Sequence, residues 1–315
     1  MAIKGIVMRI FNVRNSLSTA ALVSMIIATC MFPALESAAA ETFHLTLGYT
    51  GTAYQETTNQ DIKVAVRLLI QKVALKYFGK SEATYYDSIP EMAAALNSGK
   101  VQVLCGPPEE FMDLRNRAPV DPILITSSSN GPQTELLLLV RKDSGIQTLS
   151  DLKNKSIVLP LRYGKANMFR VWIETLLMRA GHANLEAYFS VVKETRTATR
   201  GIMPVFFHQA DACVVTRQLF NLAAELNPQL ARELVPIARI PNLSQGIISV
   251  DRRLPVEIRD KIKQAFMTLP DSPEGKQLLM LFQVKKIVPF RPEYLAGTEA
   301  LFAEHQRLKT RFARR

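Results

Sequence analysis

The sequence predicts an α/β protein with largely parallel sheets, organised as about two lobes. Apolar runs of strand length alternate with helix-period patterns from residue 44 to near the C-terminus, and this alternation is typical of βα units. The chain has 315 residues, which is longer than one average domain. Hydrophobic residues make up 48% and charged residues 21%, so most of the chain can bury a core.

Residues 1–40 are predicted to be a secretory signal peptide. Basic residues precede an uncharged, largely apolar stretch over 16–35, and Pro33 interrupts that stretch. The small residues 38–40 form a cleavage pattern that would release the mature chain after Ala40. An uncleaved membrane anchor is the alternative, because about 20 apolar residues can span a bilayer. A cleaved signal places residues 41–315 in the periplasm.

The chain is basic, with a formal net charge of +11. An exported protein meets no genomic DNA, so we expect no nucleic-acid partner despite this charge. Part of the excess is local, since five of the last nine residues are Arg or Lys. A solvated helix end explains such a cluster.

The first half of the mature chain alternates predicted strands and helices. Residues 44–50 alternate in polarity and end at Gly51, which is typical of a half-buried strand. Ser88 and Glu91 have the spacing of a capping box, and Gly99 ends the helix that they begin. Strands are predicted over 44–50, 84–88, 101–105, 122–126 and 135–141, and helices over 61–77, 89–98 and 109–117.

The same rhythm restarts after the turn at 143–145. Helices then dominate the C-terminal part, where Ser272 precedes a helix that begins at Pro273. Strands are predicted over 156–160, 187–193, 212–215, 234–240, 246–250 and 286–290, and helices over 166–180, 199–209, 218–226, 255–269, from 273, and 293–311.

Enzyme motifs are missing from the sequence. There is no GxGxxG, GxxxxGK[ST], HExxH or GxSxG pattern, and no two histidines have metal-ligand spacing. We therefore predict a protein that is not an enzyme and that uses no cofactor and no metal. Cys105 and Cys213 lie in short apolar runs, so we expect buried thiols, although an exported chain could also form a disulfide bond.

Candidate binding residues lie where predicted strands run into helices. Ligands of open α/β sheets bind at the carboxyl ends of strands, where helix N-termini point outward. Four such ends occur, at 49–52, 105–107, 161–167 and 216–217. In the third, Arg162 and Lys165 bring two cations to one helix start, which suits a clamp for a carboxylate or phosphate and equally a solvated loop.

Four segments of the mature chain share a pattern with one known family. The most specific is 140–155, VRKDSGIQTLSDLKNK. The others are 92–103 (MAAALNSGKVQV), 209–212 (QADA) and 252–262 (RRLPVEIRDKI). These segments resemble the phosphate/phosphite/phosphonate family of ABC-transporter substrate-binding proteins. Gln102 stands where that family usually has an Asp.

The resemblance implies a type II periplasmic-binding-protein fold, with two α/β lobes joined by two crossover segments and a ligand cleft between them. Lobe I would be residues 41–141 plus 246–315, and lobe II residues 142–245, with hinges at 142–145 and 243–246. The implied function is that of a monomeric solute-binding protein of an ABC importer, which closes over a small solute and docks on a membrane permease. The alternative is a sensor module of the same fold that presents its ligand-bound form to a membrane histidine kinase.

One departure leaves the ligand open. Family members that hold a phosphonate place a Ser-Thr-Ser-Gly run at the first helix of the second lobe, where this sequence has 162–167, RYGKAN. A phosphonate, a carboxylate, another oxyanion and a degenerate pocket all remain possible. The residues predicted to contact the ligand are Tyr49, Thr50, Thr52, Gly106, Tyr163, Lys165, Asn167, Thr195 and Asp211.

Overall fold

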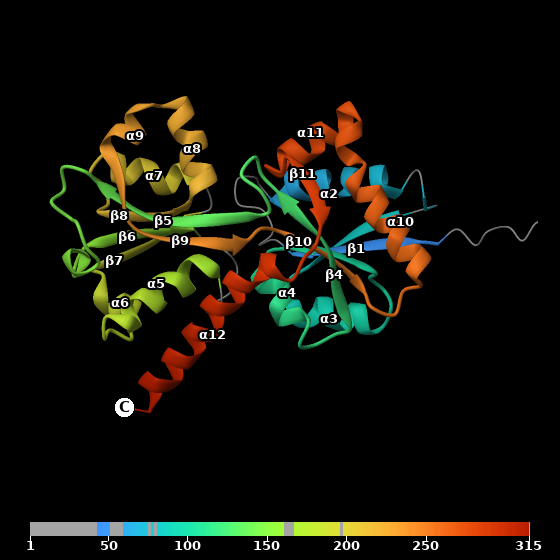
Figure 1. Cartoon of the computed structure of the whole chain (residues 1–315), viewed down its shortest axis with the longest axis horizontal. Coiled ribbons are helices and arrows are strands. Elements are labelled where there is room, and N and C mark those ends of the chain that lie inside the picture. Colours follow the sequence, from blue (N-terminus) through green and yellow to red (C-terminus); the bar gives the residue numbers. More distant parts are fainter. Residues whose placement is uncertain are drawn as a thin grey trace, which may run out of the picture. The chain divides into compact units, whose positions relative to one another are not determined.

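The described part of the chain contains two β-sheets, each covered by helices on both faces (Figure 1). The computed structural model describes residues 43–50, 59–74, 77–78, 81–160, 167–195 and 198–314. The predicted signal peptide lies outside these residues. None of the helices in the described ranges is long and apolar enough to cross a membrane.

The first sheet has six strands in the order β2-β1-β3-β10-β4-β11. β1 runs parallel to β2 and β3, whereas β10 runs antiparallel to both β3 and β4, and β11 runs antiparallel to β4. The strands are β1 (Leu45–Thr50), β2 (Ser81–Tyr86), β3 (Val103–Gly106), β4 (Val120–Ser127), β10 (Ile247–Asp251) and β11 (Lys286–Pro289).

The second sheet repeats the plan of the first with five strands, in the order β7-β6-β8-β5-β9. β6 is parallel to β7 and β8, and β5 is antiparallel to β8 and β9. In each sheet the chain arrives from the other sheet on a strand that runs antiparallel to its neighbours, β10 in the first sheet and β5 in the second. The strands are β5 (Gln133–Arg141), β6 (Ser156–Pro160), β7 (Val191–Thr195), β8 (Ala212–Thr216) and β9 (Leu234–Ser244).

Four apolar clusters fill the space between sheets and helices, and central strands such as β1 and β8 are buried on both faces. In the first sheet, α2, α10 and α11 cover one face, and α3 and α4 the other. In the second sheet, α7, α8 and α9 cover one face, and α5, α6 and α12 the other. The helices are α2 (Asn59–Ala74), α3 (Ile89–Asn97), α4 (Pro108–Leu114), α5 (Met168–Arg179), α6 (Leu185–Tyr188), α7 (Ala198–Phe206), α8 (Arg217–Leu226), α9 (Gln229–Glu233), α10 (Val256–Met267), α11 (Pro273–Leu281) and α12 (Glu293–Ala313).

The first passage between the sheets lies earlier in the chain than the expected boundary at 141/142. β5 pairs with β8 and β9, so the chain leaves the first sheet at 128–132. The run Leu136–Val140 is fully buried and therefore occupies the middle of a sheet, and its pairing with β8 and β9 makes this the second sheet. The expected hinge at 142–145 follows β5 within the second sheet's half, whereas 243–246 joins β9 to β10.

The C-terminal helix α12 also differs from the expectation that it belongs wholly to the first lobe. Leu295 in its first turn packs with the first sheet, but Leu301 packs into the cluster of the second sheet. The Thr298 hydroxyl accepts a hydrogen bond from the backbone N–H of Ser244 in β9 at 2.8 Å. The third passage between the sheets in the described chain therefore runs from residue 290 through the first turns of α12.

Most predicted elements are present with shifted ends, and one region differs in kind. The strand expected over 187–193 begins only at Val191, because residues Leu185–Tyr188 form α6. The Asn184 side chain caps that short helix by accepting from the backbone N–H of Ala187 at 3.0 Å. The predicted cap of α3 is confirmed, since Ser88 Oγ accepts from Glu91 N. The return bond of the predicted capping box is displaced by one residue, because Glu91 Oε2 accepts from Asp87 N and not from Ser88 N.

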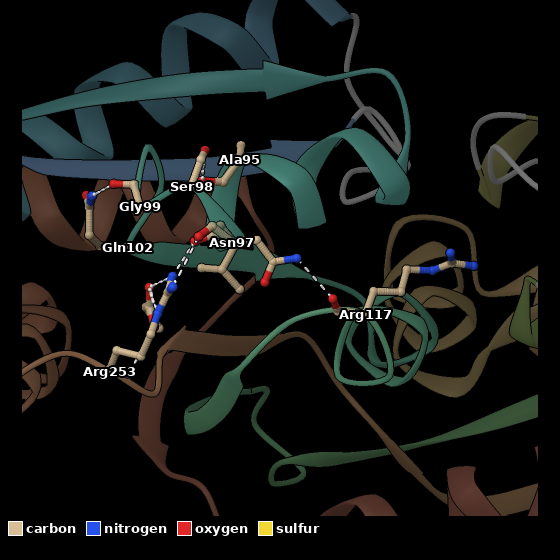
Figure 2. Close-up of polar contacts among 9 residues, drawn as sticks. Ala95, Asn97, Ser98, Gly99, Gln102, Arg117 and Arg253 are labelled. Carbon is tan, nitrogen blue, oxygen red and sulfur yellow. Dashed lines mark hydrogen bonds and ion pairs between the residues drawn. The ribbon is translucent and has the colours of Figure 1, made fainter.

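The turn after α3 shows which contacts Gln102 makes (Figure 2). This residue stands where the family that the sequence resembles usually has an Asp. Gly99, at a φ of 74°, turns the chain out of the helix, and Gln102 Nε2 donates to its carbonyl at 2.6 Å. Gln102 Oε1 accepts from Thr46 N of β1 at 2.9 Å. Arg253 donates to the carbonyls of Leu96 at 2.6 Å and Asn97 at 3.1 Å. Gln102 thus joins the α3 turn to β1.

Candidate ligand-binding cleft

A cavity of about 220 Å³ lies where strand ends of both sheets meet. The first sheet contributes Gly106 at the end of β3, Thr126 in β4 and Ile247 at the start of β10. The second contributes Thr134 at the start of β5 and Thr216 at the end of β8. The antiparallel strands begin at the end of the sheet where the parallel strands finish. All five residues therefore lie at the same end of the strands in their sheet.

One side of the cavity is apolar and comes from the first sheet and its helices. These residues, which we call the apolar wall, come from α2, α10, α11 and β11 and the turn between the last two. They are Leu69, Phe266, Leu279, Leu281, Phe282 and Ile287.

Neutral polar groups also line the cavity, among further apolar residues such as Met168 and Leu219 of the second half. Gln218, at the start of α8, donates from Nε2 to the carbonyl of Gln283 at 3.2 Å, so one hydrogen bond joins the two halves across the cavity. Gln245 Nε2 lies within hydrogen-bond distance of Ser128 Oγ (3.1 Å) and Gly131 O (2.9 Å). Gln245 therefore connects the cavity to the first two passages between the sheets.

Two helices of the second half begin at the cavity. α5 starts at the lining residue Met168, and the Asn167 side chain caps it by accepting from Arg170 N at 2.9 Å. α8 starts after Thr216, whose hydroxyl accepts from Leu219 N at 3.3 Å. Helix N-termini carry partial positive charge and unpaired N–H groups, so both favour a negatively charged ligand.

Three charged side chains next to the cavity, those of Glu110, Glu135 and Arg217, are paired with other side chains. Arg217 forms an ion pair with Glu135 beside the start of β5. The Thr50 hydroxyl lies 2.6 and 2.8 Å from the two carboxylate oxygens of Glu110 and donates to them. A Cβ at Gly106 would lie 2.9 Å from Glu110 Oε2, so glycine leaves room for this carboxylate. Among the described lining residues there is no Lys, Arg or His.

The predicted site residues of the first sheet divide between the cavity and the core. Gly106 lines the cavity, and Thr50 lies next to it through Glu110. Tyr49 is buried in the core with its ring edge-on to Tyr85, at a centroid distance of 5.8 Å. Burial raises the pKa of the Tyr49 hydroxyl above its usual value.

The predicted site residues of the second sheet are dispersed. Asn167 caps α5 and is buried. Thr195 ends the edge strand β7 next to Pro160 of β6, and it does not line the cavity. Asp211 lies just before β8, at the end of the sheet opposite to the cavity, and accepts from Ser156 N at 2.8 Å. Thr52, Tyr163 and Lys165 lie outside the described residues.

Several lining residues carry no local sequence signal. Thr134 begins β5 just after the first passage, Gln245 lies in the second passage, and Phe282 follows a helix far along the chain. The sequence places Thr216 at the end of a predicted strand, but no neighbouring residue distinguishes it from the other helix-capping residues. Only the pairing of distant strands brings these residues to one cavity.

The two described cysteines form no disulfide bond. Cys213 is fully buried, whereas Cys105 is partly buried and lines the cavity. Burial raises the pKa of each thiol to about 12, so both stay protonated at neutral pH. The described ranges contain no group of three or more His, Cys, Asp or Glu side chains that could hold a metal ion.

Known proteins share both the sequence pattern and the fold of this chain. Residues 59–295 match the family model described as ABC transporter, phosphonate, periplasmic substrate-binding protein. The fold is similar to that of a binding protein component of an ABC phosphonate transporter from Pseudomonas aeruginosa, with a TM-score of 0.63 and 16% identity over 85% of this chain and 88% of that chain.

Two further solved structures have the same fold. One is a Xanthomonas citri protein bound to chloride ion, with a TM-score of 0.64 and 15% identity over 85% of this chain and 99% of that chain. The other is PhnD1 from Prochlorococcus marinus in complex with methylphosphonate, with a TM-score of 0.62 and 13% identity over 83% of this chain and 97% of that chain. No curated protein matches the sequence.

Proposed function

The chain belongs to the phosphonate periplasmic substrate-binding proteins of ABC transporters, and on that premise we propose that its solute is a phosphonate-type oxyanion with an apolar substituent. The cavity between the two sheets carries this proposal, because it combines an apolar wall with two helix N-termini. The helix ends suit the anionic head. The apolar wall suits an alkyl or aryl group.

Neutral donors fit the head group of such a ligand. The described lining offers the hydroxyls of Thr126, Thr134 and Thr216 and the amide of Gln218. An oxyanion held by neutral donors and helix ends needs no buried cation. A relative of the same fold is in complex with methylphosphonate, which supports a phosphonate in preference to a carboxylate.

We further propose that the ligand acts by closing the cleft. A solute that touches both halves favours the closed arrangement by the difference between its affinities for the two states. The hydrogen bond from Gln218 to the carbonyl of Gln283 across the cavity would further stabilise the closed state. The closed form would be delivered as a monomer to a membrane permease, after export and removal of residues 1–40. Neither the family match nor the cavity favours the sensor alternative.

Calorimetric titration of residues 41–315 with methyl-, propyl-, butyl- and phenylphosphonate tests the proposal. We expect affinity to rise with chain length, by about fourfold for each methylene group that enters the apolar wall. Butyrate serves as a carboxylate control and should bind more weakly than propylphosphonate. The absence of binding for every phosphonate, or tightest binding of methylphosphonate, would contradict the proposed ligand.

A pair of neighbouring variants tests the wall itself. Leu281 lines the cavity and is 55% exposed, whereas Met280 is 72% exposed and does not line it. We expect Leu281→Asn to weaken butylphosphonate binding by about fivefold and to leave methylphosphonate unchanged. Met280→Asn should change neither.

A further inference from the structure

We propose that the chain has a second anion site, outside the cleft, that binds a soluble oxyanion of phosphate type. The site is a pocket of about 310 Å³ at the first passage between the sheets. The pocket is lined by the serine run Ser127–Ser129 with Gly131, by the two cations Lys286 and Arg291, and by Tyr294. The pocket shares no lining residue with the cleft, and the proposal does not depend on the proposed function.

The serine run forms a closed turn that holds its hydroxyls in place. Ser128 and Gly131 exchange backbone hydrogen bonds at 3.1 and 3.3 Å, and Asn130 N donates to Ser128 Oγ at 3.2 Å. Gly131 adopts a φ of 105°, which only glycine adopts without strain. The turn is therefore built into the backbone, and its shape does not depend on a ligand.

The segment from β11 to the start of α12 brings two cations to this turn. Lys286 lies opposite Ser127 in the pairing of β11 with β4, and the backbone N–H of Lys285 donates to Ser127 O at 3.0 Å. Arg291 follows two residues after β11. Tyr294, in the first turn of α12, adds a phenolic hydroxyl to the lining.

The charge of the pocket points to an anion. Lys286 and Arg291 are exposed, and neither forms an ion pair with any described residue. No described lining residue is acidic. Two cations that line one pocket repel each other, and an oxyanion between them removes that repulsion. The guanidinium group can bind two oxygens at once, while the ammonium, the phenol and the Ser129 hydroxyl can donate to the others. The hydroxyls of Ser127 and Ser128 already donate to the carbonyls of Ser128 and Gly131, at 3.3 Å each.

The pocket adjoins the joint between the two halves of the chain. Gln245, which lines the cleft, donates to Ser128 Oγ and to Gly131 O of the serine turn. An oxyanion bound here would join the first passage, β11 and α12.

Titration of residues 41–315 with inorganic phosphate, in a buffer free of other oxyanions, tests the site. The test variant is Lys286→Met with Arg291→Gln. The matched control is Lys309→Met with Arg311→Gln, which removes the same charge from exposed positions of α12 far from the pocket. We expect the test variant to lose one bound phosphate, or to bind it at least tenfold more weakly, and the control variant to bind as the unmodified chain does.

Acetylation of lysines, followed by mass spectrometry, locates the ion without any substitution. Phosphate should slow the acetylation of Lys286 and leave that of Lys309 unchanged. A test variant that binds phosphate as the unmodified chain does, equal loss in both variants, or an unmodified chain that binds no phosphate would each overturn the site. Because phosphonate binding in the cleft is measured separately, failure of one proposal leaves the other standing.

Discussion

Asp211 and Ser156 join the first residues of β8 and β6 through reciprocal hydrogen bonds. Asp211 Oδ2 accepts from Ser156 N at 2.8 Å and from Ser156 Oγ at 2.7 Å, and Ser156 Oγ in turn accepts from Asp211 N at 3.0 Å. The backbone N–H groups of both residues, the Ser156 hydroxyl and Asp211 Oδ2 therefore each have a partner. The carboxylate holds two strands together at the end of the sheet away from the cavity.

Removal of this carboxylate should change stability and leave binding intact. In Asp211→Ala the Ser156 N–H loses its acceptor, and we expect the free energy of unfolding to fall by about 1–3 kcal/mol. Urea unfolding measures this loss, and titration with a phosphonate measures affinity. Asp113→Ala, which removes only a surface ion pair with Arg117, should cost no more than about 0.5 kcal/mol. If Asp211→Ala instead binds the phosphonate more weakly at unchanged stability, Asp211 contacts the ligand.

Single residues of the site could be predicted only where a local rule applies. Gly106 follows a short buried strand, and the carboxyl ends of parallel strands are where ligands bind, so its position followed from the sequence. Tyr49 satisfies the same rule, yet its ring packs into the core against Tyr85. Thr134 and Phe282 obey no such rule, because strand pairing and a distant helix bring them to the cavity.

α12 approaches β9 at a glycine. Gly297 lies so close to Asn242 O that an added Cβ would fall far inside van der Waals contact with that backbone oxygen. One residue later, the buried Thr298 accepts from Ser244 N. The first turns of α12 are thus fixed on the end of β9, just before the second passage.

Gly297→Ala should therefore be destabilising although alanine is the better helix former. We expect a loss of about 1–3 kcal/mol, because either the helix or β9 must shift to admit the methyl group. Gly201→Ala in α7 is the matched control, since its nearest contact would be an ordinary one of 3.4 Å to Thr195 Cγ2. That control should be neutral or stabilising by up to about 1 kcal/mol. Equal effects of the two substitutions in urea unfolding would contradict the close approach.

At the level of elements, the sequence predicted most strands and helices but not all their neighbours. The run Leu136–Val140 is apolar enough to be a buried strand in either sheet. Its place between β8 and β9 is a property of the whole topology, and no local pattern encodes it. The short helix α6 was missed because its four residues are too few to show a period.

A row of ion pairs joins α12 to α5. Glu174 accepts from Arg170 Nε at 2.7 Å and lies 2.8 Å from His305 Nε2, and Glu304 accepts from Arg179 at 2.6 and 2.8 Å. Burial alone would raise the pKa of Glu174, but its hydrogen bonds and charged partners outweigh burial and lower it. The hydrogen bond from Arg179 lowers the pKa of Glu304.

These shifts predict how the whole molecule responds to acid. A carboxyl whose pKa is lower in the folded chain than its usual 4.5 binds more protons when unfolded. Its stabilising effect is complete above that value and is lost as the pH falls through the folded pKa. We expect the free energy of unfolding to decline below about pH 4.5, and the decline to be shallower in Glu174→Gln with Glu304→Gln.

Urea unfolding at pH 7, 5, 4 and 3 measures the slope. Glu225→Gln, at an exposed glutamate without an ion pair in the described chain, is the control and should keep the slope of the unmodified protein. An unchanged slope in the double variant would show that other groups dominate the acid response.

The three passages between the sheets meet at one place. The Gln133 amide, which follows the first passage, lies 3.3 Å from the carbonyl of Asn242, before the second, and 3.5 Å from those of Glu293 and Tyr294, within the third. A joint of three segments held together reaches fewer open arrangements than a joint of two. The proposed closure of the cleft would then lose less conformational entropy. A larger part of the interaction energy with the solute would therefore contribute to the binding affinity.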